Sequence, residues 1–321
     1  MSWDSIDQAL SKLKSSSPKS WEGYLGFYSS WLGGYFRESW AMMVPMDDHG
    51  FHRGDGVFEA ARIYEGAYID LQAHLLRLER SAKAIGMKLP KSVEEIESIV
   101  VELAKRCGSS TGILRLYVTR GPGGFSPSPA EVSGHQIYAA ITKIKPPDTR
   151  MYEEGVRALF CETPAKEPFW AQIKSCNYLQ NVLMKMESNT KGFDFPISIS
   201  PEGQLCEGAT ENLMILTKNK SLIVPRFDYT LRGTTVSVVM RLAEELKASG
   251  EIRSVSLGDI RREDLLNAEE AAFVGTTLGV LPIGSIDGKP VGSGRAGQVM
   301  PRLNQRLLKA MATEPALRTV F

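Results

Sequence analysis

Two segments in the first half of the chain place apolar residues at the three- and four-residue spacing of amphipathic helices. Apolar positions from Leu75 to Ile85 mark one helix over residues 74–84, and Val93–Cys107 carries the same spacing. Runs of β-branched and aromatic residues, bounded by Gly, Asp or Pro, predict the strands around these helices. These strands are Val57–Ile63, Ala67–Leu71, Gly112–Thr119 and Gln136–Ile144. The first half is therefore predicted to be a mixed α/β domain.

Consecutive prolines at Pro146 and Pro147 follow the last of these strands and cannot continue a hydrogen-bonded ladder. We place a linker at residues 146–150, between a domain of residues 1–145 and a domain of residues 151–321. The second half again mixes strands and helices. Its strands are predicted at Val156–Cys161, Pro196–Ser200, Asn212–Thr217 and Leu222–Val224, and its helices from Gly233 to Gly250 and over Gln298–Met311.

Composition and charge narrow the class of protein. The chain has 321 residues, 43% of them hydrophobic, and 38 Lys and Arg against 37 Asp and Glu. Because no block of like charge stands out, nucleic acid and anionic membranes are not expected partners. The longest uncharged stretch, Ala271–Ile286, is too short for a membrane span, and charges near the N-terminus argue against a secretory signal. Four cysteines without a CxxC motif indicate reduced thiols, so we expect a cytoplasmic protein.

Two short motifs resemble known binding sites, but the sequence around them does not support binding of a dinucleotide or a metal. Gly292–Gly297 spells GxGxxG, but too little chain follows it for a crossover and a second parallel strand, so we expect a loop. His49 and His52 stand close to Asp47 and Asp48, but no further ligands follow at a known spacing. We therefore expect no metal.

The candidate chemistry begins with Lys174, which lies between an apolar run and the predicted start of a helix at Leu179. Taken alone, it is most simply a solvated lysine. Glu207 stands next to a glycine between two apolar strands, and residues 231–235 open a helix with backbone N–H groups and hydroxyls suited to an anion. Residues 275–277 close a strand with two more hydroxyls.

Six segments, taken in order, resemble the motif series of the fold-type IV, class IV pyridoxal-phosphate aminotransferases. That family includes branched-chain and D-amino-acid aminotransferases and aminodeoxychorismate lyase. The resemblance runs from about Asp48 to Met311, and it implies a small N-terminal α/β domain, a larger C-terminal pseudo-barrel domain, a cofactor in the cleft between them and a homodimer. The segments are RGDGVFE at 53–59, HLLRL at 74–78, KSCNY at 174–178, CEG at 206–208 with Asn212, LRGTT at 231–235 and GTT at 275–277.

The resemblance also implies a role for each matching residue. Lys174 is expected to form the aldimine with pyridoxal 5'-phosphate and then to move the Cα proton, which requires an amine whose pKa is lowered by burial. Glu207 is expected to pair with the pyridine nitrogen, and Arg77 to clamp the phosphate. Without the motif series, Arg77 is simply a surface arginine and Glu207 an exposed acid. The remaining expected cofactor contacts are Tyr178, Leu231, Gly233, Thr234, Thr235 and Thr276, with Asn212 as a support of the loop.

The residues on the substrate side separate the members of the family. Phe58–Arg62 resembles the Phe-Glu-x-x-Arg stretch of branched-chain enzymes, but Arg53 stands where those enzymes usually carry Tyr. The Arg and His that hold the carboxylate in the familiar D-amino-acid enzymes are absent after Thr119-Arg120-Gly121. The lyases match at Arg120–Gly124, but Phe125 replaces their Arg.

Arg53 and Arg115 offer another way to bind a carboxylate, because the resemblance brings both to the cleft. For Arg115, an ion pair with Glu59 or another acid is an equally good interpretation. Phe58 and Thr277 complete the expected substrate contacts.

We therefore predict an aminotransferase that takes D-alanine or D-glutamate as amino donor, with pyruvate or 2-oxoglutarate as acceptor. A 4-amino-4-deoxychorismate lyase is the second hypothesis, and a branched-chain L-amino-acid aminotransferase is the third. A pyridoxal-phosphate-binding relative without activity is disfavoured, because Lys174, Glu207 and Arg77 are all present.

Overall fold

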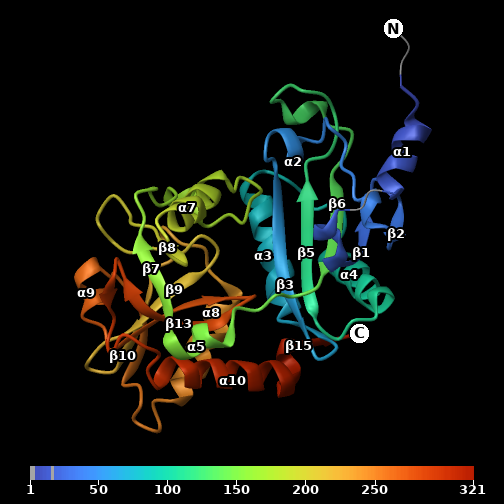
Figure 1. The fold of residues 1–321 in the computed structure, drawn as a ribbon. Helices are drawn as coiled ribbons and strands as arrows, with labels where there is room; N and C mark the ends of the chain where they lie inside the picture. The colour runs from blue at the N-terminus through green and yellow to red at the C-terminus, as the bar shows by residue number, and fades with distance from the viewer. Residues whose placement is uncertain (1–3, 16–17) are drawn as a thin grey trace. The chain divides into compact units, whose positions relative to one another are not determined.

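The structure, a computed structural model, describes residues 4–15 and 18–321 (Figure 1). It divides into two compact units. Unit 1 is the chain up to Ile144 together with Thr319–Phe321, and unit 2 is Lys145–Arg318. The expected division assigned the last three residues to the second domain. They belong to unit 1 because β15 is the neighbour of β4 at the edge of its sheet.

Unit 1 is built on a seven-stranded sheet in the order β15-β4-β3-β5-β6-β1-β2. The pairings from β4 to β2 are antiparallel. Its strands are β1 (Tyr24–Ser29), β2 (Gly34–Phe36), β3 (Gly56–Tyr64), β4 (Ala67–Ile69), β5 (Gly112–Thr119), β6 (Gln136–Thr142) and β15 (Arg318–Val320).

Two helices cover one face of this sheet. Helix α3 (Leu71–Ala84) packs against β3, and α4 (Val93–Cys107) packs against β1 and β6. The strand predicted over Ala67–Leu71 ends early, because Asp70 adopts a left-handed backbone and precedes α3. The other helices of the unit are α1 (Ile6–Ser15), α2 (His49–His52) and three 3₁₀ turns at Lys19–Gly23, Ser39–Ala41 and Pro129–Glu131.

Unit 2 contains a mixed eight-stranded sheet in the order β11-β10-β9-β12-β13-β7-β8, with β14 paired to β13. The β10–β11, β13–β7 and β7–β8 pairs are parallel, and the other pairs are antiparallel. Its strands are β7 (Val156–Phe160), β8 (Phe195–Ile197), β9 (Asn212–Leu216), β10 (Ser221–Pro225), β11 (Ser254–Gly258), β12 (Glu270–Gly275), β13 (Gly279–Ile286) and β14 (Lys289–Pro290).

The helices of unit 2 depart most from the predicted bounds in two places, while α10 differs from its predicted bounds by one or two residues at each end. The predicted linker is already helical at Thr149, because the Asp148 carboxylate accepts the Arg150 N–H at 2.9 Å and caps a helix. The helix after Gly233 ends at Glu245 instead of Gly250. The helices are α5 (Thr149–Glu154), α6 (Pro168–Ala171), α7 (Leu179–Thr190), α8 (Thr234–Glu245), α9 (Arg262–Leu266), α10 (Val299–Thr313) and a 3₁₀ turn at Pro315–Leu317.

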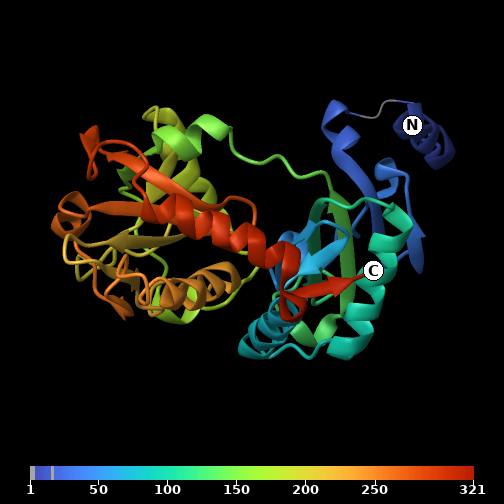
Figure 2. The same ribbon diagram turned by 90° about the horizontal axis from the view of Figure 1, so that it is seen from below.

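Helix α10, the long red helix in Figure 2, packs against β13 and α8 within unit 2. In the described ranges, no helix combines the length and apolar character needed to cross a membrane. The chain is thus a two-domain α/β protein, as predicted.

Candidate active site

Most of the expected cofactor residues are connected by contacts within unit 2. Lys174 lies in the segment between α6 and α7, and its Nζ is 5.9 Å from the centroid of the Tyr178 ring. The Glu207 carboxylate accepts the backbone N–H of Leu231 at 3.0 Å. Lys174 also attracts the Glu207 carboxylate electrostatically. The lysine, the tyrosine and the acid therefore belong to one site.

Glu207 lies in an environment that resists its charge. Burial raises its pKa to about 7, although the Leu231 N–H, Lys166 and Lys174 all act to lower it. The acid at Glu211 acts in the same direction as burial. The interpretation of Glu207 as an exposed acid is therefore wrong. A carboxylate with one backbone donor and a raised pKa is suited to accept a further charged N–H group.

Asn212 holds the backbone that faces this acid. Its Nδ2 donates to the carbonyl of Leu231 at 2.9 Å, and residues 207 and 212 form a β-bridge. A Cβ atom at Gly233 would lie 2.0 Å from the Asn212 Oδ1, so glycine is required there. Asn212 thus supports the loop, which is the role expected for it.

Helix α8 starts beside the same loop. Its N-cap residue is Gly233, which has no side chain that could accept a hydrogen bond from the first N–H groups of the helix. Thr234 is the first helical residue, and the Thr235 Oγ1 lies 3.4 Å from the Thr276 Oγ1. Thr277 follows in the turn between β12 and β13. A helix start and two adjoining hydroxyls are typical of a phosphate site.

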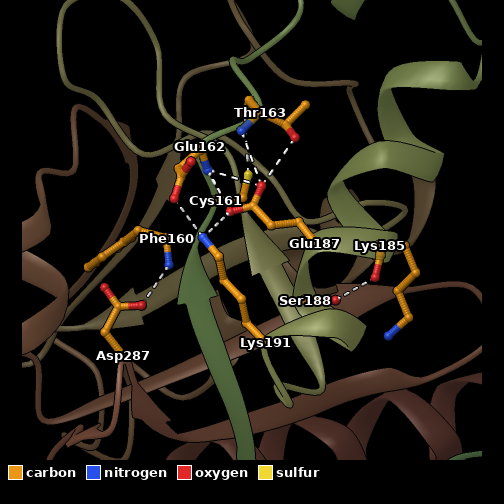
Figure 3. Close-up of polar contacts among 9 residues, drawn as sticks. All are labelled: Phe160, Cys161, Glu162, Thr163, Lys185, Glu187, Ser188, Lys191 and Asp287. Atoms are coloured by element: carbon orange, nitrogen blue, oxygen red, sulfur yellow. Dashed lines mark hydrogen bonds and ion pairs between the residues drawn. The ribbon is translucent and has the colours of Figure 1, made fainter.

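The longer segment from β7 to α7, residues 161–178, includes α6 and carries Lys174; it begins at a cluster of hydrogen bonds around Glu187 of α7 (Figure 3). The Glu187 carboxylate accepts the N–H groups of Glu162 and Thr163 at 2.9 and 3.3 Å, and the Lys191 ammonium at 2.8 Å. Burial alone would raise the pKa of Glu187, but these donors lower it. Because the carboxylate stays charged, the start of the segment is tied to α7.

A second lysine, which the sequence analysis did not select, lies in the same segment. The Lys166 Nζ is 4.9 Å from the centroid of the Tyr178 ring. Burial lowers the pKa of Lys166, and the Glu207 carboxylate acts to raise it. Its position between Pro164 and Pro168, in a turn-rich stretch ahead of the motif, is the only signal in the sequence.

Arg77 lies in unit 1, where it is buried on α3. Its Nε and Nη2 each donate to the Glu59 carboxylate at 2.7 Å, and the His74 Nδ1 lies 2.6 Å from the same carboxylate. Burial would raise the pKa of Glu59, but Arg77 and His74 lower it to about 2. The interpretation of Arg77 as a surface arginine is therefore wrong, while its contact with a phosphate remains a prediction.

The expected substrate residues Arg53, Phe58 and Arg115 also belong to unit 1. Arg53 donates to the carbonyls of His52 and Phe125, and so connects two loops. Phe58 stacks on Tyr117 with ring centroids 5.7 Å apart.

Arg115 lines a cavity of about 550 Å³ together with Tyr117, Trp21 and other aromatic residues. An ion pair between Arg115 and Glu59 is excluded, because Glu59 is paired with Leu116 and its side chain lies on the other face of the sheet. The carboxylate of Glu59 is instead satisfied from α3.

The GxGxxG stretch is a loop, as predicted. It leads into α10, and the Glu270 carboxylate occupies the start of that helix. Glu270 accepts the N–H groups of Gln298, Val299 and Met300 at 2.8, 2.9 and 2.8 Å. No dinucleotide phosphate can take the same donors.

Comparison with known proteins identifies the family. The family model described as amino-transferase class IV matches residues 56–286. The chain belongs to this family. The class IV aminotransferases use pyridoxal 5'-phosphate, so the protein is a pyridoxal-phosphate-dependent transaminase.

Individual members of the class IV aminotransferases match over most of the chain. The chloroplastic D-amino-acid transaminase of Arabidopsis thaliana is 34% identical over 91% of this chain and 78% of its own length. The D-alanine aminotransferase of Bacillus licheniformis is 31% identical over 85% and 93%. The branched-chain aminotransferase of the thermophilic archaeon Thermoproteus uzoniensis, solved with norvaline, has a TM-score of 0.80 at 26% identity, covering 92% of this chain and 99% of that chain.

The residues in unit 2 fit the cofactor of the class IV aminotransferases. The N-cap Gly233 provides no side-chain acceptor for the first N–H groups of α8, and the Thr235 and Thr276 hydroxyls adjoin that helix start. Glu207 has a carboxylate with one backbone donor, which leaves capacity for the protonated ring nitrogen. Lys174 carries a primary amine, which is the group that an aldehyde needs to form a Schiff base.

Proposed function

We propose that this class IV aminotransferase moves the amino group of a D-amino acid, D-alanine or D-glutamate, to a 2-oxo acid, with Lys174 as the residue that is linked to the cofactor. The observation that carries the proposal is the joint position of Lys174, Tyr178 and Glu207 next to the start of α8. A Schiff-base lysine, a partner for a ring nitrogen and an anion site are the three parts that a pyridoxal-phosphate enzyme needs.

When bound, pyridoxal phosphate supplies an aldehyde and an electron-accepting ring. Lys174 then has two tasks, which are to hold the cofactor and to carry the proton at the substrate Cα. Glu207 accepts the N–H of the pyridine ring in its carboxylate form. Tyr178 and Leu231 orient the ring, and the start of α8 with Thr235 and Thr276 binds the phosphate. Arg77 is proposed as a further phosphate ligand.

The preference for D-amino acids is supported by two of the named relatives, which are D-amino-acid enzymes. It is also supported by Arg53, which stands where branched-chain enzymes usually carry Tyr. We propose Arg53 and Arg115 as ligands of the substrate carboxylates, with Phe58 and Thr277 as further substrate contacts. The branched-chain L-aminotransferase is the alternative that the structural similarity favours.

We also propose that the protein works as a homodimer. Helix α7 presents Leu179, Val182, Leu183 and Met186 to solvent at helical spacing, and Leu179 is 71% exposed. Phe169 and Trp170 of α6 add two exposed rings on the same segment. An apolar surface of this kind is typical of a protein interface. We place the protein in the cytoplasm, because the described cysteines form no disulfide.

A screen of single amino acids tests the proposal. The purified holoenzyme is mixed with one D- or L-amino acid at a time, and the change of its visible absorption band is recorded. We expect D-alanine or D-glutamate to convert the band and their L-forms to leave it unchanged. Conversion by branched-chain L-amino acids alone would establish the alternative.

The role of Lys174 is tested separately. Borohydride treatment should fix the cofactor to Lys174, as identified by peptide mapping. Lys174→Ala should bind the cofactor without fixation, whereas Lys218→Ala, on an exposed hairpin, should behave as the parent protein. Fixation on another lysine would overturn the assignment.

A further inference from the structure

Two lysine side chains converge on one aromatic ring in unit 2. The Nζ atoms of Lys166 and Lys174 lie 4.9 and 5.9 Å from the centroid of the Tyr178 ring. The ring face favours a positive charge, but two ammonium groups near one ring repel each other. A positive charge on either lysine therefore disfavours a positive charge on the other.

Both lysines also act on Glu207, which lies in the same site. The charged groups that surround this acid are Lys166 and Lys174, which favour its ionised form, and Glu211, which opposes it. Glu211 is itself buried and accepts hydrogen bonds from Thr210. The single charge of the Glu207 carboxylate can balance only one ammonium group, but both Lys166 and Lys174 interact with it.

We propose that Lys166 is a positioning residue of this site, and that its ammonium group keeps Glu207 ionised and the amine of Lys174 uncharged. The inference rests on the proposed function, which requires an uncharged amine at Lys174 because only that form is a nucleophile. If Lys174 is uncharged, it cannot be the counter-charge of Glu207. Lys166 is the other ammonium that the structure places close to this acid.

The single charge on Lys166 favours the ionised form of Glu207 and the uncharged form of Lys174, which are the forms that the proposed chemistry requires. The ammonium of Lys166 attracts the carboxylate of Glu207, and it repels a proton on Lys174. A cationic neighbour is a known way to obtain an uncharged lysine at neutral pH. Glu207, in return, helps Lys166 to remain charged despite its burial.

The backbone around Lys166 is held in place, as a fixed charge requires. The N–H of Ala165 donates to the carbonyl of Ile199 at 3.3 Å, and the side chain of Gln180 donates to the carbonyl of Pro164. Helix α6 begins at Pro168 on the other side. The Glu187 cluster of Figure 3 fixes the start of the same segment.

Trace labelling of amines tests the proposal without using activity. Full-length protein, before the cofactor is added, is treated with limiting acetic anhydride between pH 6 and 10, and labelling of Lys174 is measured by peptide mass spectrometry. We expect Lys166→Met to reduce labelling of Lys174 at pH 7 on the order of tenfold, because a shift of one pKa unit changes the uncharged fraction tenfold. Lys166→Arg keeps the charge and should restore parental labelling, and Lys218→Met should have no effect.

Labelling of Lys174 within twofold of the parent in Lys166→Met would overturn the proposal. Unchanged labelling with a raised KM only for donors that carry a second carboxylate would overturn it too, and would make Lys166 a substrate ligand. If Lys166→Met does not fold, as judged by its thermal unfolding, Lys166→Gln replaces it in the same comparison with Lys166→Arg.

The labelling result is independent of the amino-acid screen. A parent protein that fails to link the cofactor would refute the proposed function, but labelling of Lys174 would still report the protonation state of its amine. A parent protein that transaminates while Lys166→Met labels normally would refute only the role of Lys166.

Discussion

Unit 2 contains two glutamates next to the starts of long helices, and they differ in how many backbone N–H groups their carboxylates accept. Glu270 is buried at the start of α10, where it accepts three backbone N–H groups at 2.8–2.9 Å. Glu207, near the start of α8, accepts one backbone N–H, from Leu231 at 3.0 Å, and burial raises its pKa. Glu270 therefore stabilises the fold, whereas Glu207 is left with capacity for a ligand.

The two helix starts differ in the same way. At α10 the protein supplies its own carboxylate, so the positive end of the helix is already neutralised. At α8 the N-cap is Gly233, and threonine hydroxyls stand alongside. The GxGxxG sequence precedes α10, whose first N–H groups are already bound by Glu270. The candidate phosphate site is at the start of α8. The partner of the N–H groups therefore decides whether a helix start can bind an anion.

The largest effect that we predict is the loss of stability in Glu270→Ala. Three backbone donors lose their acceptor, and the free energy of unfolding should fall by about 3–5 kcal/mol. Urea denaturation measures this change. Glu270→Gln keeps one acceptor oxygen and should lose less. A loss below about 1 kcal/mol in the alanine variant would show that water replaces the carboxylate without penalty.

Gly297→Ala should have the second largest effect, because the new Cβ would lie 2.2 Å from the Cδ of Glu270. Displacement of the carboxylate should lower the free energy of unfolding by about 2–3 kcal/mol and leave the affinity for the cofactor unchanged. Gly233→Ala, whose Cβ would lie 2.0 Å from the Asn212 Oδ1, should also lower stability, and in addition it should weaken cofactor binding. Thermal unfolding and cofactor titration of both variants separate the two sites. Equal loss of cofactor affinity in both would contradict the comparison.

Glu207→Gln should make the cofactor-free protein more stable at high pH. The pKa of Glu207 is raised from 4.5 to about 7, so the folded protein binds this proton more tightly and parental stability falls as pH rises through that window. The variant lacks the ionisable group. It should exceed the parent by about 2 kcal/mol at pH 8, because partial access to solvent weakens the effect, and equal it near pH 4.5. Urea denaturation at both pH values tests this. If the parent protein instead gained stability relative to the variant between pH 5 and 7, the prediction would be wrong.

The smallest effect is predicted for Thr235→Val. The variant keeps the shape of the side chain and removes the hydroxyl beside Thr276, so cofactor affinity should fall about tenfold, or about 1.4 kcal/mol. Stability should change by less than about 0.5 kcal/mol. Fluorescence titration with cofactor measures the dissociation constant. Ser293→Ala in the GxGxxG loop is the control and should bind as the parent does. Equal weakening in the control would contradict the distinction between the two helix starts.

Local sequence determined the regular elements. The bounds of α4 and β5 coincide with the predicted Val93–Cys107 and Gly112–Thr119, because periodicity and bounding glycines act over a few residues. The ordered motifs also led to the family and to the residues around Lys174 and Glu207, since each motif is read from contiguous letters.

The tertiary structure alone decided which partner satisfies each buried charge. Glu59 is neutralised by His74 and Arg77 instead of Arg115, because strand register places Glu59 and Arg115 on opposite faces of one sheet. Lys166 reaches the Tyr178 ring, and Glu270 reaches the start of α10, across stretches of chain that carry no shared pattern. Periodicity in a sequence records which side of an element is buried. It does not record which distant group lies opposite, since that depends on how packed elements meet in space.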